Sequence, residues 1–285
     1  MAAPSSERRI MGIIEGGVVI LDGIPRSFNP FGKTRRVQSG TTIQSVVNAA
    51  AAGDVIYIDG GDYDEQVSIT KDNLTLVGVG SRGAVAIAPT AANPKAITID
   101  GTGAGGRVEE VTLINLGCEG SGTGGGLHVK GNIRRLRFYG CKLEGGAFGC
   151  KLESTAQGSV GDLRFEDCEF AWTTTGLHLT ASGGGDPVTN VYVRGGLFHD
   201  CSAEWILSDV AHTTGLWVAE SLFAKEEDAS APVAGQLDVA VASSEGLFAG
   251  NYFDLATMAS ATLVIASGIR WVGNMTEAGV GGRPA

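Results

Sequence analysis

The sequence alternates apolar and polar residues in short segments that recur along most of the chain. In residues 163–170, Leu163 and Phe165 alternate with polar residues before a tight turn, and a second apolar segment ends at Phe170. Alternation with a period of two predicts a half-buried β-strand. The same frame begins again every 22 to 31 residues, at Val111, Leu136, Leu163, Val191, Leu216 and, more loosely, Leu247 and Ile269. A period of this length built on short strands predicts a solenoid of stacked coils.

Each coil contains a further apolar strand after a glycine-rich link. These strands are expected at residues 126–129, 149–152, 176–179, 205–207 and 237–241. A coil of about three strands without a helix predicts a parallel β-helix, in which equivalent residues of successive coils form ladders. The sequence lacks the Leu/Asn spacing of a leucine-rich repeat and the long four-stranded unit of a propeller.

The N-terminal part of the chain departs from the repeat. Residues 1–38 mix charged, proline and apolar residues and are expected to form an extended arm with a hairpin. Residues 41–54 predict a short amphipathic helix that begins with a capping box of Thr41 and Gln44, stops at Gly53 and covers the edge of the first coil. We therefore divide the chain into the arm (1–38), the β-helix (39–276) and a glycine-rich tail (277–285).

Residues 42–80 resemble the entry segment of the pectin-lyase-like superfamily of right-handed parallel β-helices. The matching positions are Ile43, Gln44, Val47, Ala50, Gly53, Asp54, Ile56, Ile58, Gly61, Tyr63, Glu65, Val67, Ile69, Leu74, Leu76, Gly78 and Gly80. The resemblance implies an all-β chain that forms a single-stranded right-handed parallel β-helix with a short capping helix and an N-terminal arm. It leaves the function open, because the superfamily contains lyases, esterases, hydrolases, phage tailspikes and structural proteins.

Charge is distributed unevenly along the 285 residues. The formal net charge is −10, and residues 1–36 carry +3, which leaves −13 on the remainder. An acidic body disfavours binding to nucleic acid, whereas a basic arm could dock on an acidic partner or simply be solvated. The basic residues of the expected docking arm are Arg8, Arg9, Arg26, Lys33, Arg35 and Arg36.

The five cysteines have neither zinc-finger nor redox spacing. Cys141 and Cys168 hold equivalent positions in consecutive coils, so we expect them to stack as small buried residues rather than to form a disulfide or a metal site. The odd number of cysteines and the lack of a secretion signal favour assembly in a reducing compartment. The apolar stretch 10–22 is too short and too charged to span a membrane.

The sequence has no recognisable catalytic motif. Polygalacturonase and pectin methylesterase signatures are absent, as are nucleophile and phosphate-loop motifs. The best alternative enzymatic cluster is the set Asp167, Glu169, His199 and Asp200, because neighbouring coils lie about 4.8 Å apart. Such a cluster could perform acid–base chemistry or bind a cation, although polar residues are common at a turn anyway. The remaining histidines, expected in solvent or in a loop without a metal partner, are His128, His178 and His212.

One outward-facing position recurs in each coil and defines the outward column. Its expected members are Thr112, Arg137, Arg164, Tyr192, Trp217, Phe248 and Arg270. The aromatic members Tyr192, Trp217 and Phe248 predict an apolar contact surface, unless a loop or the tail covers them or they form a sugar platform. Arg137 and Arg164 should repel each other unless Glu166 or a partner's carboxylates meet them.

The chain most resembles non-enzymatic β-helical phage virion proteins, and this resemblance implies a structural virion protein of a tailed bacteriophage. The features above fit self-assembly in a cytoplasm followed by docking on a larger shell. We expect a capsid decoration or cement protein, or else a tail component, that assembles in the host cytoplasm as a homo-oligomer, most simply a trimer. Its partners would be the major capsid protein or other virion proteins, with no cofactor, nucleic acid or membrane. The alternative is a polysaccharide-active enzyme, a lyase or glycoside hydrolase of the tailspike depolymerase kind.

Overall fold

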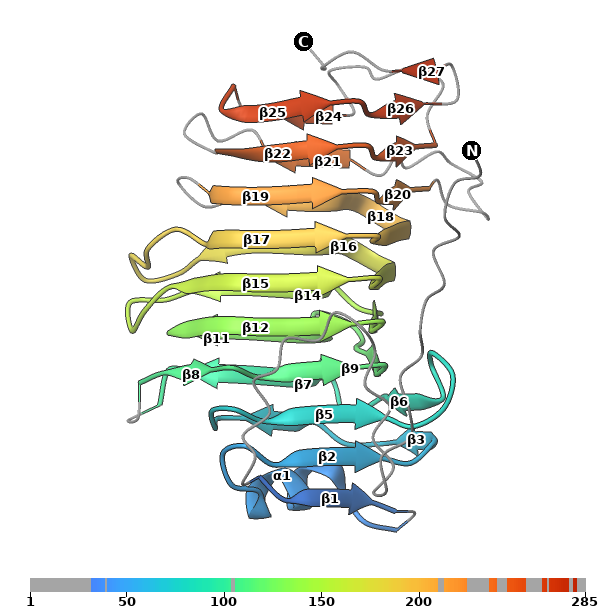
Figure 1. Cartoon of the computed structure of the whole chain (residues 1–285), viewed down its shortest axis with the longest axis vertical. Coiled ribbons are helices and arrows are strands. Elements are labelled where there is room, and N and C mark those ends of the chain that lie inside the picture. Colours follow the sequence, from blue (N-terminus) through green and yellow to red (C-terminus); the bar gives the residue numbers. More distant parts are fainter. Residues whose placement is uncertain are drawn as a thin grey trace, which may run out of the picture.

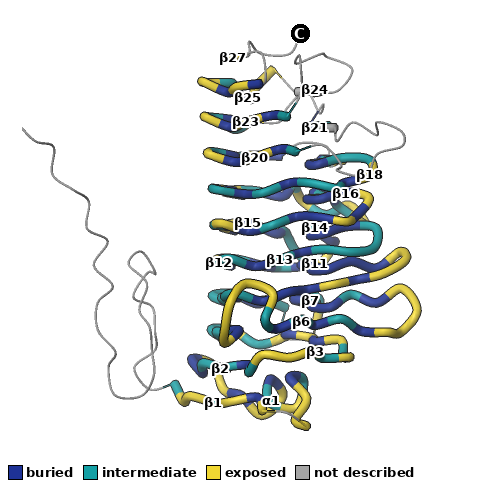
Figure 2. The backbone as a smooth tube through the Cα atoms, turned by 90° about the vertical axis from the view of Figure 1, so that its right-hand side faces the viewer, coloured by how far each residue is buried: buried dark blue, intermediate teal, exposed yellow. Residues whose placement is uncertain are grey.

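The computed structural model describes residues 32–38, 40–103, 106–209, 213–224, 236–239, 245–254, 263–265, 267–276 and 279–280. These residues form an all-β solenoid whose coils stack along one axis, with one short helix, α1 (Ile43–Ala49), at the end that contains β1 (Figures 1 and 2). Two sheets, of 11 and 16 strands, run the length of the stack. The predicted parallel β-helix is confirmed.

The first sheet takes one strand from each coil. Its strands, in spatial order, are β1 (Thr34–Val37), β2 (Val55–Ile58), β5 (Thr75–Gly78), β9 (Thr112–Ile114), β12 (Ile133–Tyr139), β15 (Val160–Glu166), β17 (Thr189–Arg194), β19 (Thr214–Ala219), β22 (Glu245–Ala249) and β25 (Ile269–Val272), with β8 (Val108–Glu109) beside β12. Every pair in this sheet is parallel.

The second sheet contains the other strands of each coil in two ladders. One ladder has β3 (Gly61–Tyr63), β6 (Val85–Ile87), β10 (Gly117–Glu119), β13 (Lys142–Glu144), β16 (Glu169–Ala181), β18 (Leu197–Ser208), β20 (Leu222–Phe223), β23 (Tyr252–Phe253), β26 (Met275–Thr276) and β27 (Gly279–Val280). The other has β4 (Val67–Ile69), β7 (Lys95–Gly101), β11 (Gly125–Gly131), β14 (Phe148–Ser154), β21 (Gln236–Val239) and β24 (Leu263–Ile265). The ladders join because β16 and β18 each continue through both.

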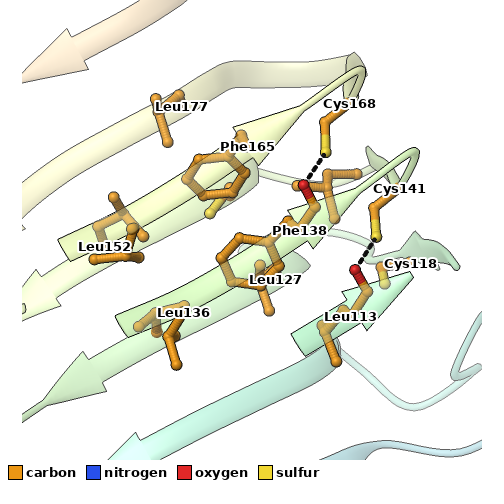
Figure 3. Packing of buried hydrophobic residues seen from close by; sticks show 14 of the residues in the cluster. Leu113, Cys118, Leu127, Leu136, Phe138, Cys141, Leu152, Phe165, Cys168 and Leu177 are labelled. Carbon is orange, nitrogen blue, oxygen red and sulfur yellow. Dashed lines mark hydrogen bonds between the residues drawn. The ribbon is translucent and has the colours of Figure 1, made fainter. Parts of the chain in front are cut away.

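The register confirms that residues one period apart are vertical neighbours. Phe165 pairs with Phe138 of the preceding coil and with Val193 of the following coil. Inward positions therefore meet like residues, and the rings of Phe138 and Phe165 stack with their centroids 4.5 Å apart (Figure 3). A longer stack, with centroid separations of 4.5 to 4.7 Å, runs through Phe170, Phe198, Phe223 and Phe253. These ladders make one continuous core.

Cys141 and Cys168 lie inside the solenoid, as predicted. All five are buried and none forms a disulfide. The Cys168 thiol points to the carbonyl oxygen of Phe138 at 3.5 Å, and the Cys141 thiol points to that of Leu113 at 3.6 Å (Figure 3). The equivalent position in consecutive coils thus makes the same contact with the coil before it.

Helix α1 covers the first coils. Ile43 and Val47 are buried against the core, and the N-cap is Thr42, whose hydroxyl oxygen accepts a hydrogen bond from the Ser45 backbone. The predicted capping box with Thr41 is therefore wrong by one residue. Both ends of the helix are also satisfied from the neighbouring coil: the Glu65 carboxylate accepts from the first amides, and the Lys71 ammonium donates to the last carbonyls.

The ladders extend beyond the predicted segment boundaries. Strand β1 lies within the segment predicted as an arm, yet it pairs in parallel with β2. Strand β27 lies within the predicted tail and pairs antiparallel with β26. The stack therefore begins and ends with strands that sequence periodicity alone did not assign to it, while residues 1–31 and 281–285 lie outside the described residues.

The outward column follows the prediction as far as Trp217 and then departs from it. Successive partners are Thr112, Arg137, Arg164, Tyr192, Trp217, Leu247 and Arg270. Phe248, predicted to face outward, is 0% exposed and pairs with the inward Val218. The cause is a register irregularity between Thr214 and Leu216, since a slip of one residue moves a side chain to the opposite face of a sheet.

Candidate functional site

Three of the four residues of the predicted enzymatic cluster lie together on the second sheet. His199 on β18 places Nδ1 2.6 Å from a carboxylate oxygen of Asp200 and Nε2 3.2 Å from a carboxylate oxygen of Glu169 on β16. The fourth, Asp167, lies at the preceding corner in a left-handed backbone conformation (φ 53°). Within the described chain, no hydrogen bond joins its carboxylate to the other three.

The charges of this cluster stabilise one another. The pKa of His199 is raised, mainly by its hydrogen bond with Glu169, and Asp200 adds to this effect while burial opposes it. The same hydrogen bond is the main reason that the pKa of Glu169 is lowered. The raised pKa favours the protonated form of His199, which lies between two carboxylates and ties β18 to β16.

A loop from a distant coil closes one side of the cluster. The loop that joins β5 to β6 projects from the side of the stack, and its Arg82 approaches Glu169 with a nitrogen–oxygen distance of 3.7 Å (Figure 1). The Arg82 guanidinium also donates a hydrogen bond of 2.7 Å to the Asp167 carbonyl oxygen. Asp167 therefore contributes its backbone, rather than its carboxylate, to this site.

An exposed tryptophan lies beside the cluster. Trp172 is 54% exposed and adopts a left-handed backbone conformation (φ 46°), which is rare for a bulky residue. Its ring meets His199 edge-on at 5.2 Å between centroids, and the Lys142 ammonium lies 4.2 Å from its centroid. Lys142 also pairs with Glu144 at 2.8 Å. Burial raises the pKa of Glu144, with Lys142 opposing this effect.

The cluster could hold an acid and a base, but its members are largely engaged with each other. Across the described ranges, no group of three or more His, Cys, Asp or Glu side chains is arranged to hold a metal ion. A hollow that is lined in part by Arg137 and Arg164 lies elsewhere, on the first sheet. The geometry is therefore that of a network that links coils, flanked by one exposed aromatic ring.

The aromatic residues of the outward column form a smaller surface than predicted. Tyr192 and Trp217 meet edge-on, with ring centroids 4.6 Å apart, and Trp217 is 45% exposed. On the second sheet, Leu222, Tyr252 and Met275 are register partners and are 37–43% exposed. We call these three residues the apolar column. It was not foreseen, although its register can be read from the repeat.

The predicted docking residues divide into two groups. Arg8, Arg9 and Arg26 lie outside the described residues. Arg35 pairs with the buried Asp54 at 2.5 Å, and Arg36 pairs with Asp59 at 2.8 Å. The pKa of Asp54 falls to about 2 although burial opposes this, because Ala51, Arg35 and Lys33 donate hydrogen bonds to the carboxylate. Arg35 and Arg36 thus fasten β1 to the first coil.

The other histidines differ from expectation in one case. His128, predicted to face solvent, is buried and makes a 2.8 Å hydrogen bond with Glu153. Burial lowers its pKa to about 4, so this imidazole is neutral at neutral pH. His178 is partly exposed and bonds to Asp209 at 2.8 Å, while His212 lies outside the described residues.

The chain shares its parallel β-helix fold with several solved structures. An alginate lyase from Paenibacillus sp. str. FPU-7 is similar over 87% of this chain and 97% of its own, with 11% identity and a TM-score of 0.61. A pectin methylesterase in complex with a hexasaccharide is similar over 88% of this chain and 91% of its own, with 14% identity and a TM-score of 0.52.

A third solved structure, ORF18 of Geobacillus virus E2, is similar over 82% of this chain and 56% of its own, with 15% identity and a TM-score of 0.43. Neither a protein-family model nor a curated protein matches the sequence. At these identities the likeness establishes the fold and leaves the chemistry open. The one helix among the described residues is too short to cross a membrane.

Substitution of His199 should change the pH dependence of stability. The raised pKa means that the stabilisation by His199 is fully present below the unfolded value of about 6.5 and is lost as the pH rises through the folded pKa. His199→Gln should therefore lower the unfolding free energy by about 1 kcal/mol at pH 6 and by less at pH 9. Denaturant unfolding at both values measures this difference.

Glu169→Gln is the matched control, because Glu169 is the main cause of the raised pKa. In the Glu169→Gln background, the further change His199→Gln should show a smaller pH dependence, with only the contribution of Asp200 remaining. An equal loss of stability at pH 6 and pH 9 from His199→Gln alone would contradict a raised pKa for His199.

Proposed function

We propose that this chain is a structural protein of a tailed-bacteriophage virion, specifically a capsid decoration or cement protein that associates as a trimer. The virion part of this proposal rests on the resemblance to β-helical phage proteins described above. The part that concerns assembly is carried by one observation, the apolar column on the coils nearest the C-terminus.

The apolar column continues a row of residues that includes charged side chains in the middle of the stack. In register, this row passes from Asp62 through Ala86 and Gly117 to Lys142 and Glu169, and then becomes Leu197, Leu222, Tyr252 and Met275. Contiguous exposed apolar side chains commonly mark a contact with another protein. The change from charged to apolar residues along one row supports a contact surface that is confined to the last coils.

The polar cluster favours a structural role over a catalytic one. His199, Glu169 and Arg82 neutralise each other's charges across three coils. Such a network adds connections between coils, as a rigid fibre or shell component requires. The charged groups of the network are engaged with one another, and the hollow beside Arg137 and Arg164 lies on the other sheet.

The docking role of the arm now has a different physical basis. Within residues 1–31, three basic residues balance three acidic ones, and two of the remaining three basic residues pair within the first coil. Net positive charge is therefore a weak reason for docking. The stretch 10–21, which contains eight of Ile, Leu, Val and Met, offers an apolar segment that could instead bind a shell.

Light scattering tests the assembly. The wild-type protein should have three times the 29.3 kDa mass of one chain. Tyr252→Lys should lower this mass to that of a monomer, because a charge placed opposite an apolar surface loses its hydration without a partner. Val79→Lys, which adds the same charge at a similarly exposed apolar residue of the early coils, should leave the trimer intact. A wild-type monomer would refute self-assembly.

Deletion of residues 1–31 tests docking without removing β1 or its ion pairs. The truncated protein should unfold at the same temperature as the full chain and keep its oligomeric mass. It should no longer cosediment with capsid shells prepared without this protein, whereas the full chain should. Unchanged cosedimentation after truncation would move the docking surface from the arm to the solenoid.

A polysaccharide-active enzyme remains a second candidate because of one specific observation. Glu144 and Glu169 lie on neighbouring coils, and the pKa of the first is raised while that of the second is lowered. Carboxyl groups whose pKa values differ in this way can serve as an acid and a base in the cleavage of sugar polymers. The exposed Trp172 nearby could stack against a sugar ring.

An activity assay distinguishes the candidates. Under the structural proposal, incubation with alginate or pectin should release neither new reducing ends nor unsaturated uronates that absorb near 235 nm. Product formation that disappears in Glu169→Gln and in Glu144→Gln, but persists in the control Lys151→Gln, would establish the enzyme instead.

A further inference from the structure

Two arginine side chains lie next to each other on the outer face of the first sheet. Arg137 on β12 and Arg164 on β15 are direct register partners. Neighbouring strands are about 4.8 Å apart, and like charges placed directly opposite each other destabilise a sheet. The free chain therefore bears an electrostatic cost at this position unless an anion is present.

The chain's own carboxylates do not remove this cost. Among the described residues, neither Arg137 nor Arg164 forms an ion pair, and the predicted pairing of Arg164 with Glu166 is absent. The neighbouring basic residues are already paired, Arg135 with Glu109 and Glu110 and Arg194 with Glu220. Nε of Arg137 is buried and has no hydrogen-bond partner. A buried donor without a hydrogen-bond partner lowers the stability of the folded chain.

A hollow opens at the same place. It has a volume of about 190 Å³ and is lined by Arg135, Leu136, Arg137, Asp162, Arg164 and Tyr192. Its one carboxylate, that of Asp162, already accepts a 2.8 Å hydrogen bond from Asn190. Sites for small molecules usually measure roughly 300–1,000 Å³, so this hollow suits a single acidic group better than a whole ligand.

The surroundings of the hollow have the composition of a protein contact. The Arg164 guanidinium lies over the Tyr192 ring at 5.2 Å, and Tyr192 in turn contacts the exposed Trp217. Arginine, tyrosine and tryptophan are the residues that most often dominate protein–protein binding. An acidic group that enters beside Arg137 would thus lie next to the half-buried Tyr192 and, beyond it, the exposed Trp217.

We propose that this hollow binds a carboxylate side chain from an acidic segment of a partner polypeptide. The inference deepens the proposed function, on which it rests for the existence of a partner. The planar guanidinium groups of Arg137 and Arg164 can each present two parallel N–H donors to a carboxylate. Binding would offset the repulsion between the two arginines. Relief of the repulsion between Arg137 and Arg164 therefore favours binding of the partner's carboxylate.

Thermal unfolding in the presence of hexaglutamate tests the proposal at constant ionic strength. The Tyr252→Lys variant is used so that self-association does not compete for the hollow. Saturating peptide should raise its unfolding midpoint by about 3 °C, because a ligand that binds only the folded chain stabilises it. Adding Arg137→Gln or Arg164→Gln should abolish the shift. Adding Arg194→Gln, which removes the same charge from the same sheet face outside the hollow, should leave it intact.

Each contrary result has a distinct meaning. No shift with the peptide, or a shift that Arg194→Gln abolishes equally, would overturn the site. An equal or larger shift with inorganic phosphate at the same ionic strength would assign the hollow to a free anion and overturn the carboxylate assignment. Failure of the proposed function is seen separately, as a wild-type monomer in light scattering, and would leave a positive peptide result to stand as binding to another protein.

Discussion

Parallel pairing between successive coils is the constraint on which the rest of this molecule depends. Each backbone strand bonds to the equivalent strand one coil away, so a side chain's vertical neighbours are fixed by the period of the sequence. Like residues then meet like residues. Aromatic rings stack favourably, as in the run from Phe170 to Phe253. The same rule places Arg137 next to Arg164, where the two positive charges repel each other. Both outcomes follow from one geometric requirement.

At the corner that follows the first sheet, different side chains in equivalent positions contact the equivalent backbone carbonyl of the preceding coil. The Cys141 and Cys168 thiols point to carbonyl oxygens one coil below, and the Asn251 and Asn274 amides donate to the equivalent oxygens of Val218 and Phe248, at 2.9 Å each. A thiol is a weak donor and an amide a strong one. The corner therefore becomes more polar toward the C-terminus, and these four residues make the same kind of contact, whereas Gly196 and Ser221 between them do not.

The sequence period was sufficient to predict the fold, the inward ladders and the approach of His199 to Glu169, because each depends only on counting residues along the repeat. The position of Phe248 was wrong because a register irregularity near Leu216 changes the count by one. Arg82 could not be foreseen, since it reaches Asp167 across 85 residues from a loop outside the repeat. His128 was misplaced because alternation on its strand does not reveal that the outward face there is also covered.

The stack contains two kinds of outer surface, and their boundary lies near its middle. In the earlier coils, outward charges pair between neighbours, as Arg135 does with Glu109, so the surface is stable in water without a partner. In the last coils, the outward positions include the exposed apolar residues Leu222, Tyr252 and Met275, together with the charged Arg270. Arg164 stands at this boundary, with Arg137 on one side and Tyr192 on the other. A partner that bridged both kinds of surface would need an acidic group followed by apolar ones, and this order fixes the direction in which it could bind.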